Sequence, residues 1–333
     1  MNLVNQFFQG TCWGPVLWNL FYEDSNAAID NAGSTEVKFA DDLNAFKEFD
    51  AGVRDDTIHK AMDKCQANLH RWGTANQVAF DASKEGKRIL SRRRPSGDAF
   101  LLLGVSFDCA LIMDDAISGL VKRCRWKLRT LLRSQRHFEA CALVNLYKSR
   151  MLGFIEYRTA AIYHASDSLL QTLDAIQRRF LEHVGASEIE ALFRFNLAPL
   201  ASRRDSAMQG LIHRTVLGKG SQHFQQFFRL QEGEPLAGRH RLQLVEYTQG
   251  DYTDFVYPHS QPAQYITHSG LGLTTVYNLL PAEVVEASGS VSEFQAKLQE
   301  ILRSQASRGA DSWSSTFSPR WSIAHHPLRS LIS

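Results

Sequence analysis

The chain has 333 residues, 44% hydrophobic and 22% charged, as in ordinary globular proteins, which excludes a largely disordered chain. A formal net charge of +2 excludes a uniformly acidic or basic protein, although the basic residues cluster along the chain. The five cysteines are an odd number without a Cys-x-x-Cys pair, which argues against a disulfide framework and a thiolate zinc site. We therefore expect an intracellular protein, nuclear or cytoplasmic, and not a secreted one.

The stretch from Met1 to Tyr22 carries no charged side chain and is long enough to raise the question of a membrane span. Polar residues, glycines and Pro15 interrupt it and no basic leader precedes it, so we expect no signal peptide, no membrane helix and no membrane partner. The pattern instead predicts a Gly-containing loop and then a helix with Pro15 in its first turn. This helix is expected to bury Val16, Leu17, Leu20 and Phe21.

A hairpin with two adjacent carboxylates is predicted in the next segment, "EVKFADDLNAFKEFD". Apolar residues alternate on both sides of the pair, so Val37 to Lys47 should form two antiparallel strands with Asp41 and Asp42 at the turn. Adjacent like charges are relieved by a proton or a cation, and Mg²⁺ takes oxygen ligands of this kind. The alternative is a solvated turn, because Asp is common in turns for local hydrogen-bonding reasons.

Further along, helical spacing of apolar residues predicts a helix from Asp55 to Trp72. "NQVAFDASKEGKRIL" predicts a second hairpin-like unit, and "AFLLLGVSFD" a strand that Gly104 interrupts. An amphipathic helix should begin near Ser166 and end at Gly185. The last third of the chain is rich in turns and aromatics and predicts no definite architecture.

A basic segment, Leu120 to Arg136, holds seven Lys or Arg and no acid. On a helix its apolar residues fall on one side and a stripe of cations on the other: Lys122, Arg125, Arg129, Arg133 and Arg136. A second basic cluster spans residues 84–94. Such a stripe is suited to phosphate backbones, and Trp126 beside it to stacking on a base. The alternatives are a solvated face and a half-buried tryptophan.

These segments, taken in order, resemble reverse transcriptases of the non-LTR retrotransposon type over about half of the chain. "QGTCWGPVLWNL" resembles the family's Gln-Gly box, and "FADD" its catalytic Phe/Tyr-Ala-Asp-Asp box. "WGTANQVAFDASKEG" resembles the next motif, with Trp72, Asn76 and Lys84 matching and Asp81 where Asn is usual. "LLLGVSFD" resembles the strand that leads into the thumb, and "LYKSRMLGFIEYRTAAIY" and "LQTLDAIQRRFLEHVGAS" the helical segments that commonly follow.

The resemblance implies an α+β fold: a partial polymerase palm of antiparallel hairpins and packed helices (1–112), a mainly helical thumb or connection (113–232) and a region of unknown architecture (233–333). It implies RNA-templated DNA synthesis with Mg²⁺, an RNA template, a DNA primer and deoxynucleoside triphosphates. Asp41 and Asp42 would be catalytic metal ligands, and Lys84 would protonate the departing pyrophosphate or hold phosphate. Substrate and template contacts would come from Gln9, Gly10, Phe39, Lys122, Arg125, Arg129 and Arg133.

The family's two-metal clamp needs a third carboxylate, which its members supply from a strand before the Gln-Gly box, together with the fingers. Met1 to Phe8 contain no Asp or Glu. We therefore expect the chain to be truncated at its start, to need an upstream polymerase segment, and to have little activity alone. Whether it acts as an enzyme stays open at this point. The alternative is a non-catalytic nucleic-acid-binding remnant that retains the palm and thumb surfaces.

Overall fold

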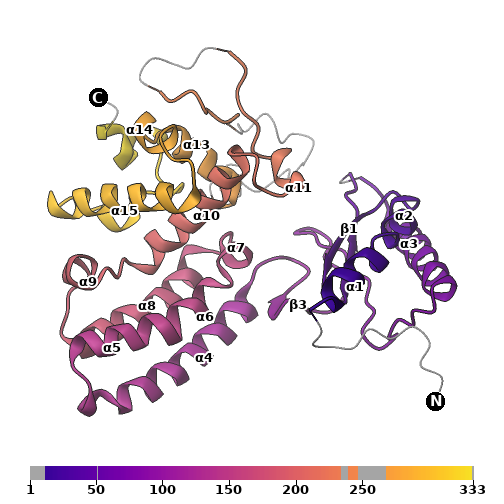
Figure 1. The fold of residues 1–333 in the computed structure, drawn as a ribbon, viewed down its shortest axis with the longest axis horizontal. Coiled ribbons are helices and arrows are strands. Elements are labelled where there is room, and N and C mark those ends of the chain that lie inside the picture. Colours follow the sequence, from indigo (N-terminus) through magenta and orange to yellow (C-terminus); the bar gives the residue numbers. More distant parts are fainter. Residues whose placement is uncertain (1–11, 51, 234–238, 247–267, 332–333) are drawn as a thin grey trace. The chain divides into compact units, whose positions relative to one another are not determined.

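The computed structural model describes residues 12–50, 52–233, 239–246 and 268–331 (Figure 1). It has an α+β fold in which helices dominate and two small antiparallel sheets are present, which confirms the predicted class. The chain divides into two compact units, which we call unit 1, as far as Ile89, and unit 2, from Leu90 onward. No helix in the described part of the chain is long and apolar enough to cross a membrane.

Unit 1 contains three helices and one hairpin in its described residues. Its elements are α1 (Gly14–Tyr22), α2 (Ser25–Asp30), β1 (Thr35–Phe39), β2 (Asp42–Phe46) and α3 (Asp55–Ala75). β1 and β2 pair antiparallel from Thr35 opposite Phe46 to Phe39 opposite Asp42, which confirms the predicted hairpin. α3 confirms the predicted helix and continues past Trp72 to Ala75.

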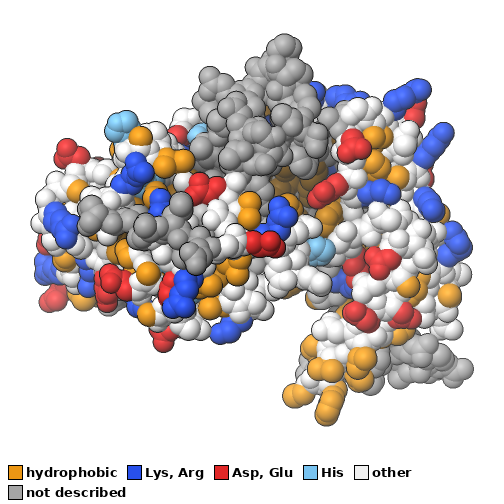
Figure 2. Space-filling model, turned by 90° about the horizontal axis from the view of Figure 1, so that it is seen from above, with side chains coloured by type: hydrophobic (Ala, Val, Ile, Leu, Met, Phe, Trp, Pro, Cys, Tyr) orange, Lys and Arg blue, Asp and Glu red, His pale blue; other side chains and the backbone are white. Residues whose placement is uncertain are grey.

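The core of unit 1 is small, and this overturns one expectation. Ile29, Ala32 and Cys65 are buried, with two partly buried leucines packed against them. α1 contributes only Tyr22 to the buried set, whereas Leu20 is 70% exposed. Hydrophobic side chains are accordingly visible on the surface of unit 1 in Figure 2. The predicted burial of Val16, Leu17 and Leu20 is therefore wrong, because amphipathic spacing identifies an apolar face but not whether anything covers it.

Two other strand predictions need correction. Residues 76–88 form turns and irregular loop, so the second hairpin-like unit is absent from this described segment. The predicted single strand around Gly104 is instead a hairpin of β3 (Phe100–Leu102) and β4 (Val105–Phe107). Its two turn residues, Leu103 and Gly104, have φ of 47° and 77°, the left-handed values that a tight two-residue turn requires. Gly104 thus marks a reversal of the chain.

The first half of unit 2 is a helical layer in which α4 packs along α8 (Figure 1). Tyr147 is stacked on Phe180 with ring centroids 4.3 Å apart at the centre of its core. α8 begins after Ser166 and ends at Gly185 (φ 73°), as predicted. The elements are α4 (Asp114–Arg133), η1 (Gln135–His137), α5 (Ala140–Tyr147), the π-helical turn η2 (Lys148–Leu152), α6 (Gly153–Glu156), α7 (Thr159–Ile162) and α8 (Asp167–Val184).

The second half of unit 2 is also helical, including the region for which the sequence predicts no architecture. A second core forms where α10 packs against α13 and α15. Buried His213 lies within it, stacked on Phe294 and 2.8 Å from the Tyr277 hydroxyl. The elements are α9 (Glu188–Phe195), α10 (Leu200–Val216), α11 (Gln222–Gln225), η4 (Gly270–Gly272), α13 (Leu273–Asn278), α14 (Ala282–Val285), α15 (Val291–Ser307), η5 (Trp313–Ser315), η6 (Ile323–His325) and η7 (Pro327–Leu331).

Candidate metal-binding hairpin and nucleic-acid interface

The two carboxylates occupy the tip of the β1–β2 hairpin, as predicted. Because Phe39 pairs with Asp42, the two residues of the turn are Ala40 and Asp41, and Asp42 is the first residue of β2. Both aspartates are exposed. Ala40 has φ of 55°, a left-handed value that costs a residue with a Cβ on the order of 1 kcal/mol or more. Because strained backbone persists only where other contacts stabilise it, Ala40 needs a contact that keeps it in this conformation.

That contact comes from α1. The indole Nε1 of Trp18 donates a hydrogen bond to the carbonyl oxygen of Ala40 at 2.9 Å. The Trp18 ring is in turn stacked on Tyr22, with centroids 5.0 Å apart, and Tyr22 meets the edge of the Trp72 ring from α3. The hairpin therefore packs on the helix that follows Pro15, and an aromatic cluster joins its turn to both α1 and α3.

Beside the turn, a hollow of about 410 Å³ is lined by residues of α1, β1 and the segment that links them. Its cation, Lys38, is fully engaged: the ammonium lies 2.6 Å from the Tyr22 carbonyl oxygen and 2.6 Å from the Glu36 carboxylate. Burial lowers the pKa of Lys38, and Glu23 and Asp24 oppose that shift. Burial and the charge of Asp41 raise the pKa of Tyr22. Lys38 is therefore a structural cation, and the exposed Phe39 is the open side chain at this end of β1.

The donor set at the turn fits a hard cation in part. Two carboxylates are the protein ligands that Mg²⁺ commonly takes, with water and substrate phosphate completing its shell. No group of three or more Asp, Glu, His or Cys side chains that could hold a metal occurs in residues 12–50, 52–233, 239–246 and 268–331. Asp41 and Asp42 alone therefore fall short of a two-ion clamp, which needs a further acidic ligand.

Lys84, the third residue predicted to be catalytic, is not joined to the turn. Lys84 lies in the loop after α3 with 84% of its side chain exposed, and its ammonium is 4.0 Å from the Asp81 carboxylate. No interaction in the described part of unit 1 joins it to Asp41 or Asp42. Asp81 accepts hydrogen bonds from the backbone N–H and the hydroxyl of Ser83, which fixes a local turn. Gln9 and Gly10 lie outside the described residues.

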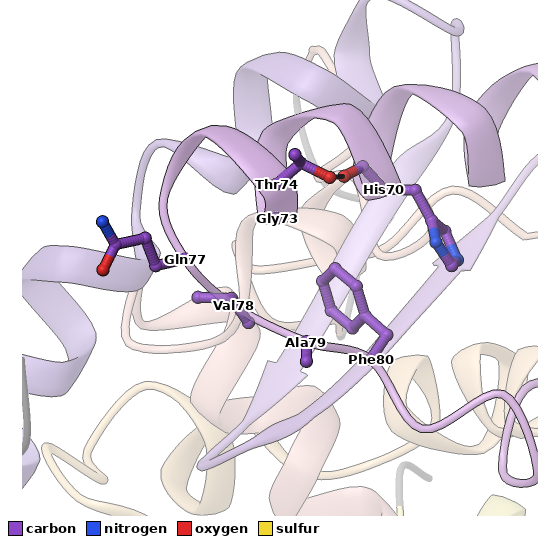
Figure 3. Close-up of a pocket in the computed structure, with 7 residues that line it drawn as sticks. All are labelled: His70, Gly73, Thr74, Gln77, Val78, Ala79 and Phe80. Atoms are coloured by element: carbon purple, nitrogen blue, oxygen red, sulfur yellow. Dashed lines mark hydrogen bonds between the residues drawn. The ribbon is translucent and has the colours of Figure 1, made fainter.

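A second hollow of unit 1, about 400 Å³, opens where α3 ends (Figure 3). The Phe80 ring covers Gly73, where a Cβ atom would lie 2.7 Å from the ring and 2.7 Å from the Val78 carbonyl oxygen. His70 at the rim lies 3.0 Å from the Glu85 carboxylate, and hydrogen bonds from Gln66 and His70 hold the pKa of Glu85 below its usual range. The hollow is formed by the end of α3 and the loop after it, and neither Asp41 nor Asp42 lines it.

The basic segment forms a helix with one buried face and one cationic face, as predicted. α4 buries Ala116, Ile117, Leu120, Val121, Cys124 and Leu128. Lys122, Arg125, Arg129 and Arg133 are exposed, and none of them forms an ion pair with another residue of the described chain. Arg136 lies just beyond α4, in η1. We call the exposed set Lys122, Arg125, Arg129 and Arg133 the α4 basic face.

The second basic cluster is less available than its sequence indicates. Lys87 pairs with Asp63 of α3, and Lys84 lies near Asp81. Arg92 donates to the Leu111 carbonyl oxygen at 3.0 Å, across the loop that leads into α4. These side chains therefore tie loops together. The α4 basic face is the stronger candidate for binding phosphates.

Sequence reasoning missed a set of cations on the flank of α4. The charged groups of Arg123, Lys127 and Arg158 lie 5.8, 4.7 and 4.6 Å from the centroid of the Phe154 ring. Arg158 is 9% exposed and donates to backbone carbonyls of Phe154 and Gly104. The spacing of Arg123 and Lys127, four residues apart, places them on one flank. Nothing in the sequence pairs them with Phe154.

Comparison with known proteins finds no protein-family model, no curated protein and no solved structure that matches this chain.

Proposed function

We propose that the chain is a segment of a reverse transcriptase of the retrotransposon type, with unit 1 as part of its palm and the α4 region as its thumb. The observation that carries the proposal is the hairpin: two adjacent carboxylates at a strained turn that an indole hydrogen bond holds in place. Strained backbone that the surroundings over-determine is typical of functional sites. The motif order of the sequence supports the same assignment.

In this proposal the reaction joins a primer to a nucleotide. The primer 3′-hydroxyl gives up its proton to water and its oxygen attacks the innermost phosphorus of a deoxynucleoside triphosphate. A P–O bond forms, and pyrophosphate leaves with the electron pair of the broken P–O bond. Asp41 and Asp42 would hold Mg²⁺, which when bound stabilises charge on the transferring phosphoryl group. Phe39, 62% exposed beside them, would contact the substrate. The α4 basic face would bind the backbones of template and primer.

The proposal includes a further polymerase segment, because unit 1 has exposed apolar side chains and a two-stranded sheet that such a segment would cover. Trp13, directly before α1, is 71% exposed, and Val16 and Leu20 of α1 are 52% and 70% exposed. The β1–β2 sheet has only two strands among the described residues, and an isolated pair of strands is marginally stable in water. A strand that adds to this sheet and carries an acidic residue would cover apolar surface and supply the missing ligand together. That segment, with the fingers, is expected to be required for activity.

A second candidate function is nucleic-acid binding without chemistry. The lack of a third acidic ligand near Asp41 in the described residues favours it, since the α4 basic face needs no metal site to bind phosphate. The two candidates differ in the role of the carboxylates. If the chain only binds nucleic acid, neutralising Asp41 should leave its affinity for nucleic acid unchanged.

Primer extension on an RNA template tests the choice. The purified chain with Mg²⁺ should show little or no extension, because charge stabilisation and substrate positioning are both incomplete. Adding an upstream fingers-and-palm segment of a reverse transcriptase of this type, in trans or fused, should restore extension, and Asp41→Asn should abolish it. Asp50→Asn, at an exposed position of the same unit, is the matched control.

Primer extension that the Asp41→Asn substitution leaves intact would contradict the proposal. Extension by the chain alone, abolished by Asp41→Asn, would show that this chain supplies the third ligand.

A further inference from the structure

Trp126 is the one large aromatic side chain within α4, and it projects into solvent. Its side chain is 68% exposed, and it makes no ring contact or side-chain hydrogen bond with another residue of the described chain. Burying an indole stabilises a protein by a few kcal/mol, so an uncovered one in the middle of a well-packed helix is a position where packing does not explain the residue. Of its four neighbours on the helix surface, those at positions 122, 123 and 129 are cations and the fourth is Thr130.

Cations surround the indole on both sides. Lys122 and Arg129, four residues before and three after Trp126, are its neighbours on the helix surface within the α4 basic face. Arg123, three residues before, borders it on the other flank, where Phe154 holds the guanidinium and Lys127 beside it. The acids of this helix, Asp114 and Asp115, lie in its first turn, about 17–18 Å away along the axis. The charged side chains of α4 nearest to the ring along the chain are therefore all cations.

An aromatic face within a cationic track is the arrangement that binds single-stranded nucleic acid. Cations follow the backbone while the ring stacks on a base, and every base has a π-face, so such stacking tolerates any sequence. A paired base inside a duplex has both faces covered by its neighbours. An indole on a convex helix therefore reaches only a base that is unpaired or at a strand end.

We propose that Trp126 is a base-stacking platform, so that α4 binds an unpaired stretch of template or primer in preference to duplex. This inference rests on the proposed function, and it specifies that α4 binds single-stranded nucleic acid. A protein partner is the weaker occupant, because the exposed apolar surface here is a single side chain and not a contiguous patch.

Equilibrium binding of the full chain to two labelled probes tests this. The probes are an oligouridine of about 10 nucleotides and an RNA–DNA hybrid duplex of the same length. Trp126→Ala should weaken oligouridine binding by roughly 5- to 150-fold, the equivalent of losing one stacked base, and leave duplex binding unchanged. Trp126→Phe should retain most of the affinity. The slope of binding against salt should stay as in the wild type, because every cation that meets a phosphate is still present.

Trp13→Ala is the matched control, since Trp13 is 71% exposed but belongs to unit 1. It should leave both affinities unchanged. Equal affinities of Trp126→Ala and wild type for oligouridine, or equal losses on both probes, would overturn the stacking inference. If the stacking inference fails but charge reversal on the α4 basic face weakens binding in the same experiments, the proposed function still stands. If charge reversal also has no effect, the assignment of α4 to nucleic acid fails with it.

Discussion

Unit 1 and unit 2 differ in how much of their apolar surface is buried. Unit 1 carries the two carboxylates but has a core cluster of only three buried residues among those described and an α1 whose apolar side chains mostly face solvent. Unit 2 has two extensive cores, and they also hold buried polar pairs: Arg204 makes two hydrogen bonds to Asp174, and Tyr163 donates to Asp205 at 2.7 Å. In the proposed function, unit 2 is self-sufficient and unit 1 is completed by a further segment.

The largest expected effect tests that contrast in stability. Phe180→Ala in α8 should destabilise unit 2 by about 3–5 kcal/mol, because the ring is fully buried against Tyr147 and leaves a cavity. Leu20→Ala in α1 should change stability by less than about 0.5 kcal/mol, since its side chain is 70% exposed. Chemical denaturation of each variant measures both. A loss of several kcal/mol for Leu20→Ala would mean that α1 is covered in solution.

A pH effect should follow from the buried polar network of unit 2. Burial raises the pKa of Asp205 to about 6, against 3.8 for an ordinary Asp, despite the hydrogen bond from Tyr163 and the nearby Arg204. A raised folded-state pKa stabilises below the ordinary value and loses that contribution as pH rises toward 6. The stability of the wild type relative to Asp205→Asn should therefore fall by on the order of 3 kcal/mol between about pH 4 and pH 6.

Denaturation of both proteins over that pH range provides the measurement, and taking the difference cancels the groups that titrate equally in each. A difference that is flat with pH would show that the Asp205 carboxyl titrates alike in the folded and unfolded chains.

Charge reversal on the α4 basic face should weaken nucleic-acid binding far more than the same change in charge elsewhere on unit 2. The triple substitution Arg125→Glu, Arg129→Glu and Arg133→Glu should weaken RNA binding by on the order of 100-fold and reduce the salt slope by roughly 2–3, about one for each phosphate that the face no longer neutralises. Filter binding across a salt series measures both quantities. Glu substitutions at Arg179, Arg308 and Arg329, exposed and dispersed over unit 2, make the same change in net charge. An equal loss of affinity in that control would assign the binding to net charge alone.

The smallest effect concerns the turn of the hairpin. Trp18→Phe keeps an aromatic ring against Tyr22 but removes the hydrogen bond to the Ala40 carbonyl oxygen, and should destabilise unit 1 by about 1 kcal/mol. Ala40→Gly should offset part of that loss, because glycine adopts a φ of 55° without strain. Amide hydrogen exchange at the β1–β2 hairpin reports both. If amide exchange is faster in Trp18→Phe and adding Ala40→Gly does not slow it, the hydrogen bond from Trp18 does not serve to hold the strained backbone of Ala40.

Strong local patterns in the sequence predict much of this structure. The β1–β2 hairpin, α3, the two faces of α4 and the ends of α8 all follow from periodicity and capping residues. The reversal at Leu103 was not predicted, because a leucine in the left-handed region has no sequence signature. The exposure of α1 was missed for a different reason, since a helix carries the same pattern whether or not its apolar face is covered.

The candidate site is predictable in part for the same reason. Asp41 and Asp42 were found from adjacent residues, and the α4 basic face from one helix. Contacts between elements distant in the chain were not predicted. The contact of Trp18 with Ala40, 22 positions apart, depends on how a helix packs on a hairpin, and that of Arg123 with Phe154 on how two helices pack. No local pattern encodes such a pairing.

Cation binding at the hairpin tests the central claim most directly, because it needs neither the further segment nor activity. Titrating the isotope-labelled chain with Mn²⁺, a paramagnetic substitute for Mg²⁺, broadens the amide signals nearest the ion. The signals of Phe39 to Asn44 should broaden first in the wild type and in Asp50→Asn. Asp41→Asn should remove that broadening. Broadening that Asp41→Asn leaves unchanged, or that begins elsewhere in the chain, would contradict the assignment of these carboxylates as metal ligands.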